Sequence, residues 1–322
     1  MHRFMRRNPA LVGMPALLVL VLAVTILVHP EFGAFDLQSL ALGALPLAMA
    51  AAAQTVVVLS GGIDLSIGSL MAVSNVLAAS TMQHASYQEA LLLAVLILIA
   101  GAVQGALNGL IVVLSRIPDV VVTLTTGFIW GGVALLILEK PGGGAPEGFL
   151  NLATGTLCTD WLCSAWVPNA LILLVTSVLL VWLPVRRTRI GLLIYAIGSD
   201  RIAAFRSGVN VELTRILAYV FGGLFSAIGG LALTMTTGIG APLAGTYYTL
   251  SGLAAIVIGG VSLTGGRGGM LGPVIAALLL TLIPTDLIYL DIDPNYGQVI
   301  QGTLIVLVVM IGGFAAFLQS RK

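Results

Sequence analysis

The chain has 322 residues, of which 58% are hydrophobic and only 8% charged, and its mean hydropathy is +1.09. A soluble domain of this length cannot keep so much apolar surface away from water, so the composition excludes a soluble protein. The formal net charge of +1 gives no electrostatic reason to expect nucleic acid as a partner.

Apolar runs long enough to cross a bilayer recur from one end of the chain to the other. The first run follows a basic stretch, but it is too long for a signal peptide and lacks a small-residue cleavage site. The sequence therefore predicts an all-α polytopic membrane protein of about ten helices, folded as a single domain over 1–322. The expected spans are 9–29, 40–60, 63–82, 90–115, 119–138, 168–184, 212–234, 249–265, 269–288 and 297–318.

The basic residues predict how these spans are oriented. If the amino terminus is cytoplasmic, alternate threading places every Lys and Arg except Lys140 on the cytoplasmic side. Cations are retained there because moving them outward opposes the membrane potential and the attraction of anionic lipids. We therefore expect both the amino and the carboxyl terminus to be cytoplasmic.

Two glycine-rich turns interrupt the apolar runs. The first turn follows the second span and reads Gly61-Gly62-Ile63-Asp64-Leu65-Ser66-Ile67-Gly68-Ser69. The second turn follows the eighth span and contains Gly259, Gly260, Gly265, Gly266 and Arg267. Paired glycines permit tight turns and close approach of helices. Aligning Gly61 with Gly259 matches polar and apolar positions, although the match is too short to establish a duplication.

Asp64 is the acidic side chain expected nearest to the hydrocarbon. A buried carboxylate is costly there unless it caps a helix or has a partner. Its position before the third span predicts that it accepts hydrogen bonds from the first amides of that span, including those of Ser66 and Ile67. A direct role in transport is the alternative.

The longest external loop, 139–168, contains Cys158 and Cys163. In an oxidising exterior these cysteines would form a short-loop disulfide, and two unpaired thiols are the alternative. Their spacing does not indicate a metal site, and His2, His29 and His84 are too scattered for a metal site or a catalytic triad. We therefore expect no enzyme activity and no metal or cofactor in this chain.

The largest cytoplasmic loop, 185–214, is predicted to contain a short helix. Asp200 suits the positive end of that helix, and Gly208 is a suitable stop. Ile202 and Phe205 would form a small apolar face available for a partner, whereas a solvated connector is the alternative. The segment reads Asp200-Arg201-Ile202-Ala203-Ala204-Phe205-Arg206-Ser207-Gly208.

The run Gly61 to Ser69 resembles the signature of permease subunits of bacterial sugar importers of the ATP-binding-cassette class, the ribose, xylose, arabinose and galactofuranose type. Further stretches resemble family positions in matching order over essentially the whole chain: Asn108-Gly109, Ile190-Gly191, Tyr195 to Gly198, Arg206 to Val209 and Gly259 to Gly269. In one departure, this chain has Thr249-Leu250-Ser251 where family members often carry an acid on each side of the leucine. Any role of those acids in specificity or gating is therefore in doubt here.

The resemblance implies several partners in the bacterial inner membrane and on its two sides. A second copy of the chain, or a paralogous permease, would complete the translocation path. ATPase subunits that bind ATP and Mg would dock on the helix 200–208, and a periplasmic binding protein would deliver a monosaccharide. The sequence itself has no phosphate-binding loop, because Lys140 precedes Pro141 and Lys322 is terminal.

Two other functions remain open at this point. One is an ATP-independent secondary carrier or channel for small neutral solutes, although apart from Asp64 the spans offer few ionisable groups for ion coupling. The other is a related importer subunit for branched amino acids or nucleosides, for which we would expect different glycine turns.

A sugar pathway needs uncharged hydrogen-bonding side chains inside the spans. Asn75, Gln104, Asn108 and Trp130 are the candidates, because the amides would be costly facing lipid and so should face the bundle interior. Hydrogen bonding between helices is the alternative explanation for each of them.

Overall fold

The computed structural model describes residues 10–159, 162–293, 295–297, 299–300, 302–303, 306 and 310. Within these ranges the regular structure is helical apart from one hairpin, β1 (Thr156–Thr159) with β2 (Leu162–Pro168). The helices are α2 (Ala10–Val28), α3 (Ala34–Leu59), α4 (Ile67–Met82), α5 (Tyr87–Ser115), α6 (Asp119–Ile137), α7 (Glu147–Thr154), α8 (Asn169–Ser177), the π-helical η1 (Val178–Trp182), α9 (Leu183–Arg187), α10 (Arg189–Ser199), α11 (Arg201–Arg206), α12 (Val211–Thr237), α13 (Gly245–Ile258) and α14 (Leu271–Tyr289).

Helices occupy the predicted spans as far as residue 289, whereas the last one, 297–318, lies largely outside the described residues. Among the described residues, six helices are long and apolar enough to cross a membrane: α3, α5, α6, the continuous run 169–187, α12 and α14. The chain is therefore a helical polytopic membrane protein. The count of ten spans and the cytoplasmic position of both termini remain predictions.

Two predicted spans are wrong at their glycine-rich ends. The span expected at 63–82 becomes helical only at Ile67, and the one expected at 249–265 is helical from Gly245 to Ile258. Both windows included residues of a glycine turn, where positive φ angles at Gly61 and Gly260 end the preceding helix. The helices beside the two turns, α4 and α13, are consequently short.

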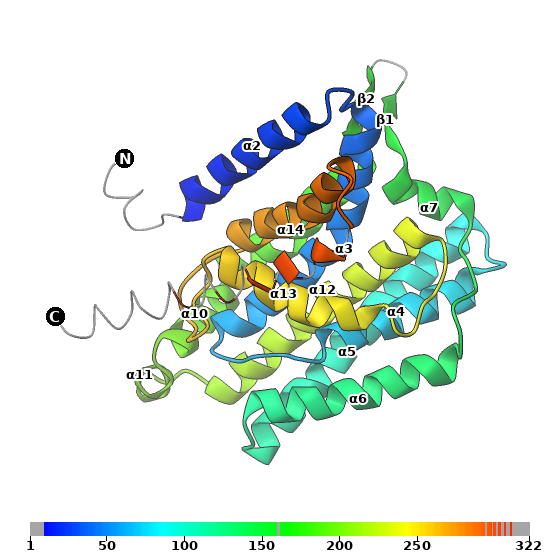
Figure 1. Ribbon diagram of the computed structural model, residues 1–322. Coiled ribbons are helices and arrows are strands. Elements are labelled where there is room, and N and C mark those ends of the chain that lie inside the picture. Colours follow the sequence, from blue (N-terminus) through cyan, green and yellow to red (C-terminus); the bar gives the residue numbers. More distant parts are fainter. Residues whose placement is uncertain are drawn as a thin grey trace.

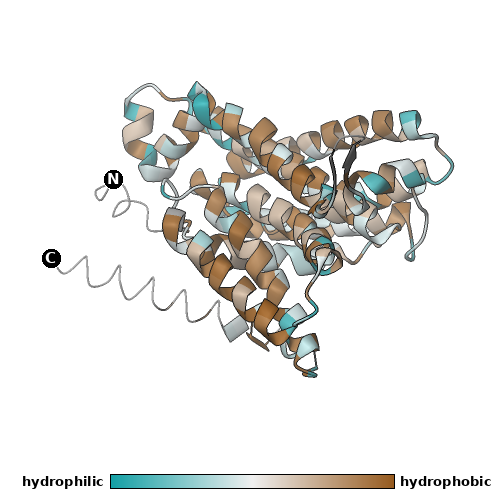
Figure 2. Cartoon of the chain, turned by 90° about the horizontal axis from the view of Figure 1, so that it is seen from above, coloured by the Kyte–Doolittle hydropathy of each residue, from teal (hydrophilic) through white to brown (hydrophobic). Residues whose placement is uncertain are grey.

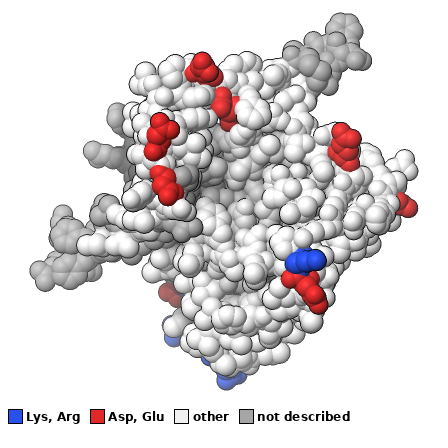
Figure 3. Space-filling view, turned by 45° about the vertical axis from the view of Figure 1, so that its right-hand side comes forward, with Lys and Arg blue, Asp and Glu red and all other residues white. Residues whose placement is uncertain are grey.

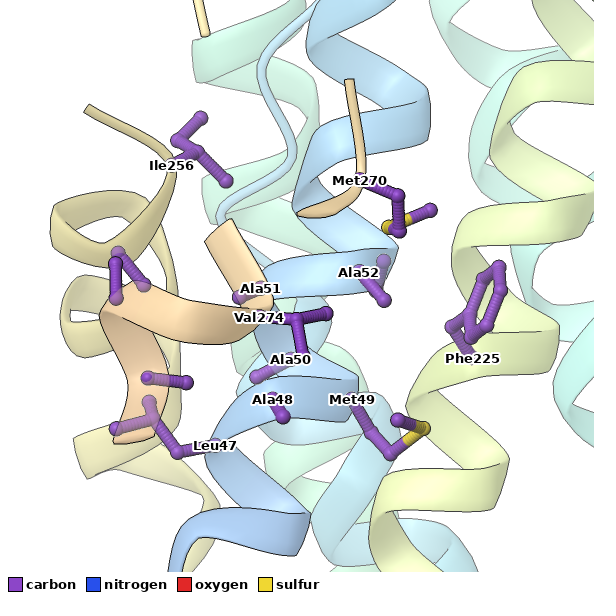
Figure 4. Close-up of a cluster of buried hydrophobic side chains, with 14 of the residues drawn as sticks. Leu47, Ala48, Met49, Ala50, Ala51, Ala52, Phe225, Ile256, Met270 and Val274 are labelled. Atoms are coloured by element: carbon purple, nitrogen blue, oxygen red, sulfur yellow. The ribbon is translucent and has the colours of Figure 1, made fainter. Parts of the chain in front are cut away.

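Helix α3 forms the centre of the bundle. Every residue from Ala44 to Leu59 is buried, as expected for a helix that is apolar around its whole circumference. Figure 4 shows the stretch from Leu47 to Ala52 with Phe225 of α12 on one side and Ile256 of α13 on the other. Figure 1 shows α12, α13 and α14 gathered around α3, and α6 on the outside of the bundle.

Helices α5 and α12 pack with their backbones in contact. A methyl group on Gly105 would overlap the carbonyl oxygen of Tyr219, and one on Gly223 would overlap the carbonyl oxygen of Gly101. Small residues permit this close approach between membrane helices because no side chain separates the two backbones. The glycines of α5 and α12 therefore fix the spacing of the bundle.

The predicted external loop 139–168 is structured, and its hairpin corrects the all-α expectation. It contains α7 and the hairpin β1–β2, and the backbones of Cys158 and Cys163 face each other in the antiparallel register. The side chains of both cysteines lie outside the described residues, so the disulfide stays a prediction. Near the start of the loop, Gly142 exchanges two backbone hydrogen bonds with Gly240, of 3.0 and 2.8 Å.

The basic residues other than Lys140 gather at one end of the bundle. The described arginines lie in or beside the α5–α6, α9–α12 and α13–α14 connections, at the end that carries α11. Lys140 lies at the opposite end among Glu89, Glu139 and Glu147. Figure 3 shows acidic groups over the upper part of one face, one basic group beside an acidic one on its right, and further basic groups at its lower edge. Figure 2 shows apolar residues along most helices. The clustering of the described arginines at one end is what the predicted sidedness requires.

Candidate functional site

The short helix α11 is confirmed between the two residues that were expected to bound it. The Asp200 carboxylate accepts hydrogen bonds of 2.9 Å from the amides of Ile202 and Ala203. At the other end Gly208 has a φ of +81°, and the Val209 amide donates to a carbonyl of the helix. Local caps thus define both ends of this helix.

The apolar face of α11 is exposed. The side chains of Ile202 and Phe205 are 65% and 70% exposed, whereas Ala204 between them is buried against the protein. A cavity of about 1120 Å³ lies beside this helix, lined also by the α5–α6 connection and the start of α12. Ile202 and Phe205, three residues apart, therefore form an uncovered apolar face on this helix.

A partly buried ion pair lines this cavity. Arg215 of α12 contacts Asp119 of α6 at 2.5 Å, and the Tyr219 hydroxyl donates to the same carboxylate at 3.1 Å. A methyl group on Gly62 would lie 2.8 Å from that carboxylate. On the next turn of α6, Thr123 donates to the Ile63 carbonyl at 3.2 Å. These contacts hold the first glycine turn against α6 and α12.

Asp64 and Ser66 of the first glycine turn connect to two of the candidate pathway residues. Fully buried Asp64 accepts hydrogen bonds from the amide of Ser66, at 2.8 Å, and from its hydroxyl. Asn108 donates to the Ser66 hydroxyl at 2.7 Å and accepts from the Trp130 indole at 3.1 Å. The predicted bond to the Ser66 amide is confirmed, but within the described residues none joins Asp64 to Ile67. The second oxygen of Asp64 likewise has no partner there.

Gly68, the last glycine of the signature, brings α4 against α13. A methyl group on Gly68 would overlap the Gly245 carbonyl oxygen, so the helices touch through their backbones. The Gly68 amide donates to the Thr249 hydroxyl at 3.2 Å. Thr249 is one of the residues at which the sequence departs from the family pattern. Here its hydroxyl accepts a hydrogen bond from the first turn of α4.

The two glycine turns share a helix-end geometry. Gly61 and Gly260 both have positive φ, and in each turn the next amide donates to the carbonyl five residues earlier. Gly61 therefore corresponds to Gly260, and the sequence alignment with Gly259 is one residue out of register. Gly259 itself packs against the start of α14, and Arg267 is exposed. Gly265 and Gly266 of this turn lie against the first turn and α10.

The other candidate pathway residues have different surroundings. Asn75 donates to the Thr234 hydroxyl and the Ile239 carbonyl, at 2.8 and 3.1 Å, and accepts from the Ala241 amide at 2.7 Å. Asn75 therefore joins α4 to α12 and to the connection after it. These contacts fit the alternative role expected for it, hydrogen bonding between helices. The Gln104 carbonyl oxygen is buried without a partner in the described part of the chain.

Sequence reasoning missed α10 as a separate helix next to α11. Its buried residues are Gly191, Ile194 and Ile197, each three residues from the next, a spacing that places neighbouring side chains on the same side of a helix. That spacing was visible in the sequence. The short length of α10, between two groups of arginines, made it look like part of a loop.

Comparison with known proteins places this geometry in a family. A family model described as branched-chain amino acid transport system / permease component matches residues 37–309. The ribose import permease of Haemophilus influenzae is 30% identical, over 91% of this chain and 90% of its own length. The galactofuranose transporter permease of Escherichia coli K12 is 33% identical, over 93% and 89%. The fructose import permease of Rhizobium meliloti is 29% identical, over 97% and 87%. No solved structure matches the chain.

These matches extend over nearly the whole chain and include both glycine turns and α11. The apolar helices and the relatives together make the chain a multi-pass protein of the bacterial inner membrane. The resemblance expected from the glycine turns is confirmed: the chain belongs to the permease family of bacterial sugar importers of the ATP-binding-cassette class.

Proposed function

We propose that this chain is the membrane-spanning subunit of an ATP-driven importer that translocates a monosaccharide. The observation that carries the proposal is the similarity, over nearly the full length of both chains, to permeases named for ribose, fructose and galactofuranose. A match of that extent includes the helices that would form a pathway as well as the cytoplasmic segment that would receive a partner.

In this proposal the energy comes from partner subunits. ATPase subunits would bind ATP and Mg and would cover the exposed apolar face of α11, formed by Ile202 and Phe205. A second copy of the chain or a paralogue would complete the pathway, and a periplasmic binding protein would deliver the sugar at the opposite end. This chain would contribute the route and its coupling to the ATPase, without chemistry of its own.

The family description also names branched-chain amino acids, which makes them a second candidate substrate. A zwitterion needs charged partners along its path, because desolvating an unpaired charge is costly. Asn75 is engaged between helices, and the remaining buried amides among the candidate pathway residues, Gln104 and Asn108, are uncharged. Uncharged donors and acceptors suit a neutral polyol better, and we therefore propose a sugar.

Purification of the tagged chain from mild detergent, followed by mass spectrometry, tests the function. We expect an ATPase with phosphate-binding loops to co-purify. Vesicles containing both proteins, with the binding protein encoded beside them, should take up ribose, fructose or galactose only when ATP is supplied. Sugar uptake by the chain alone, without ATP, would instead support the secondary carrier.

Substitution of Asp64 separates the structural role from ion coupling. Asp64→Ala is expected to lower the free energy of unfolding by about 1–3 kcal/mol, because the amide and hydroxyl of Ser66 lose their buried acceptor. Asp64→Asn keeps an acceptor oxygen, so thermal stability in detergent and ATP-dependent uptake should stay near wild-type values. An Asp64→Asn protein that is stable but inactive would show that transport requires the carboxylate charge.

A further inference from the structure

The last turn of α10 lies where both glycine turns meet the end of α3. The Gly266 amide donates to the Leu59 carbonyl at 3.1 Å. A methyl group on Gly198 would overlap that same carbonyl oxygen and would lie 2.6 Å from the Gly266 nitrogen. One on Gly265 would lie 2.8 Å from the Gly61 Cα. We call these five residues the glycine junction, in which three separate segments touch through their backbones.

Side chains of α10 add two links to the second glycine turn. The Tyr195 hydroxyl donates to the Gly268 carbonyl at 3.0 Å, and the Ser199 hydroxyl lies 3.5 Å from the Gly266 carbonyl. Burial raises the pKa of Tyr195, an effect that Arg186 opposes, so the phenol remains a neutral donor at physiological pH. The contact between α10 and this turn is therefore both steric and hydrogen-bonded.

Helix α10 is also joined directly to α11. Only Asp200 separates Ser199, the last residue of α10, from Arg201, the first of α11, and Asp200 is itself fixed as the cap of α11. Figure 1 shows the two helices next to each other at one end of the bundle. Because no flexible linker separates the two helices, a displacement of α11 should also move α10.

We propose that α10 transmits displacement of α11 to both glycine turns at once, and that Gly198 is the residue that positions it. The inference rests on the proposed function, in which an ATPase moves α11. Contacts between backbones transmit such a displacement because no flexible side chain lies between the segments to absorb it. The first turn then carries it to Asp64 and Ser66, and through Ser66 to the buried network of Asn108 and Trp130.

The test uses the complete complex of this chain, its ATPase and its binding protein in vesicles. Sugar uptake and ATP hydrolysis are measured in the same preparation, with whichever of ribose, fructose or galactose the wild type imports. Gly198→Ala is expected to lower the sugar moved per ATP hydrolysed by about tenfold or more. The amount of ATPase bound should change by less than about twofold, because α11 and its cap are intact.

Two glycines provide matched controls. Gly269 belongs to the second glycine turn and Gly132 to α6, and a methyl group on either would have no atom within 4 Å. Gly269→Ala and Gly132→Ala should keep the wild-type ratio of uptake to hydrolysis. Tyr195→Phe removes only the hydrogen bond to Gly268 and should lower that ratio by about threefold. If Gly198→Ala does not fold, the ratio of uptake to hydrolysis in Tyr195→Phe tests the role of α10.

The outcomes separate this inference from the proposed function. If wild-type complexes show no ATP-dependent uptake, the proposed function fails. If wild type transports but Gly198→Ala and Tyr195→Phe keep the wild-type ratio, the role of α10 is wrong. A loss of bound ATPase in proportion to the loss of uptake would also overturn it, because α10 would then only present α11 for docking.

Discussion

Replacing Phe205 with aspartate is expected to prevent the ATPase from co-purifying with this chain, a loss of more than about tenfold. Phe205 and Ile202 lie three residues apart on α11 and are 70% and 65% exposed. Covering them removes apolar surface from water, whereas covering an unpaired carboxylate costs desolvation energy. The measurement is the ratio of ATPase to tagged permease after purification from mild detergent.

The expected effect is specific to the apolar face of α11. Phe205→Leu keeps an apolar side chain at the same position and should retain most of the ATPase. Leu243→Asp introduces the same charge at a 65% exposed leucine in the α12–α13 connection, at the other end of the bundle, and should leave the ratio unchanged. All three variants should reach the membrane in similar amounts. Normal recovery of ATPase with Phe205→Asp would show that α11 is not the docking segment.

Helix α11 could be predicted from the sequence because its boundaries depend on local chemistry. The Asp200 carboxylate caps amides two and three residues away, and Gly208 adopts the left-handed conformation that favours glycine. The apolar runs were equally readable, because each must span the hydrocarbon by itself. Element type and caps therefore followed from neighbouring residues.

Contacts between distant segments could not be predicted in the same way. Nothing near Gly198 in the sequence indicates that it touches Leu59, because that contact arises only when α10 folds back onto α3. Asn75 and Asn108 looked equivalent as amides within apolar runs. In the structure Asn75 bonds to residues near the end of α12, whereas Asn108 bonds to Ser66 of the first glycine turn.

The same limit applies to the 39 glycines of the chain, since composition indicates close helix packing without showing which glycines carry it. The structure identifies Gly105 as one of the glycines that the close packing of α5 and α12 requires.

Gly105→Leu is expected to abolish recovery of folded, monodisperse protein, because its side chain would occupy the position of the Tyr219 carbonyl. Overpacking typically costs about 1–3 kcal/mol, and here the obstacle is backbone that cannot rotate away, so the cost lies at or above that limit. Size-exclusion chromatography of detergent extracts measures the recovery. Gly132→Leu on α6, where a methyl group would have no atom within 4 Å, should be recovered like wild type. Normal recovery of Gly105→Leu would mean that α5 and α12 do not pack backbone to backbone.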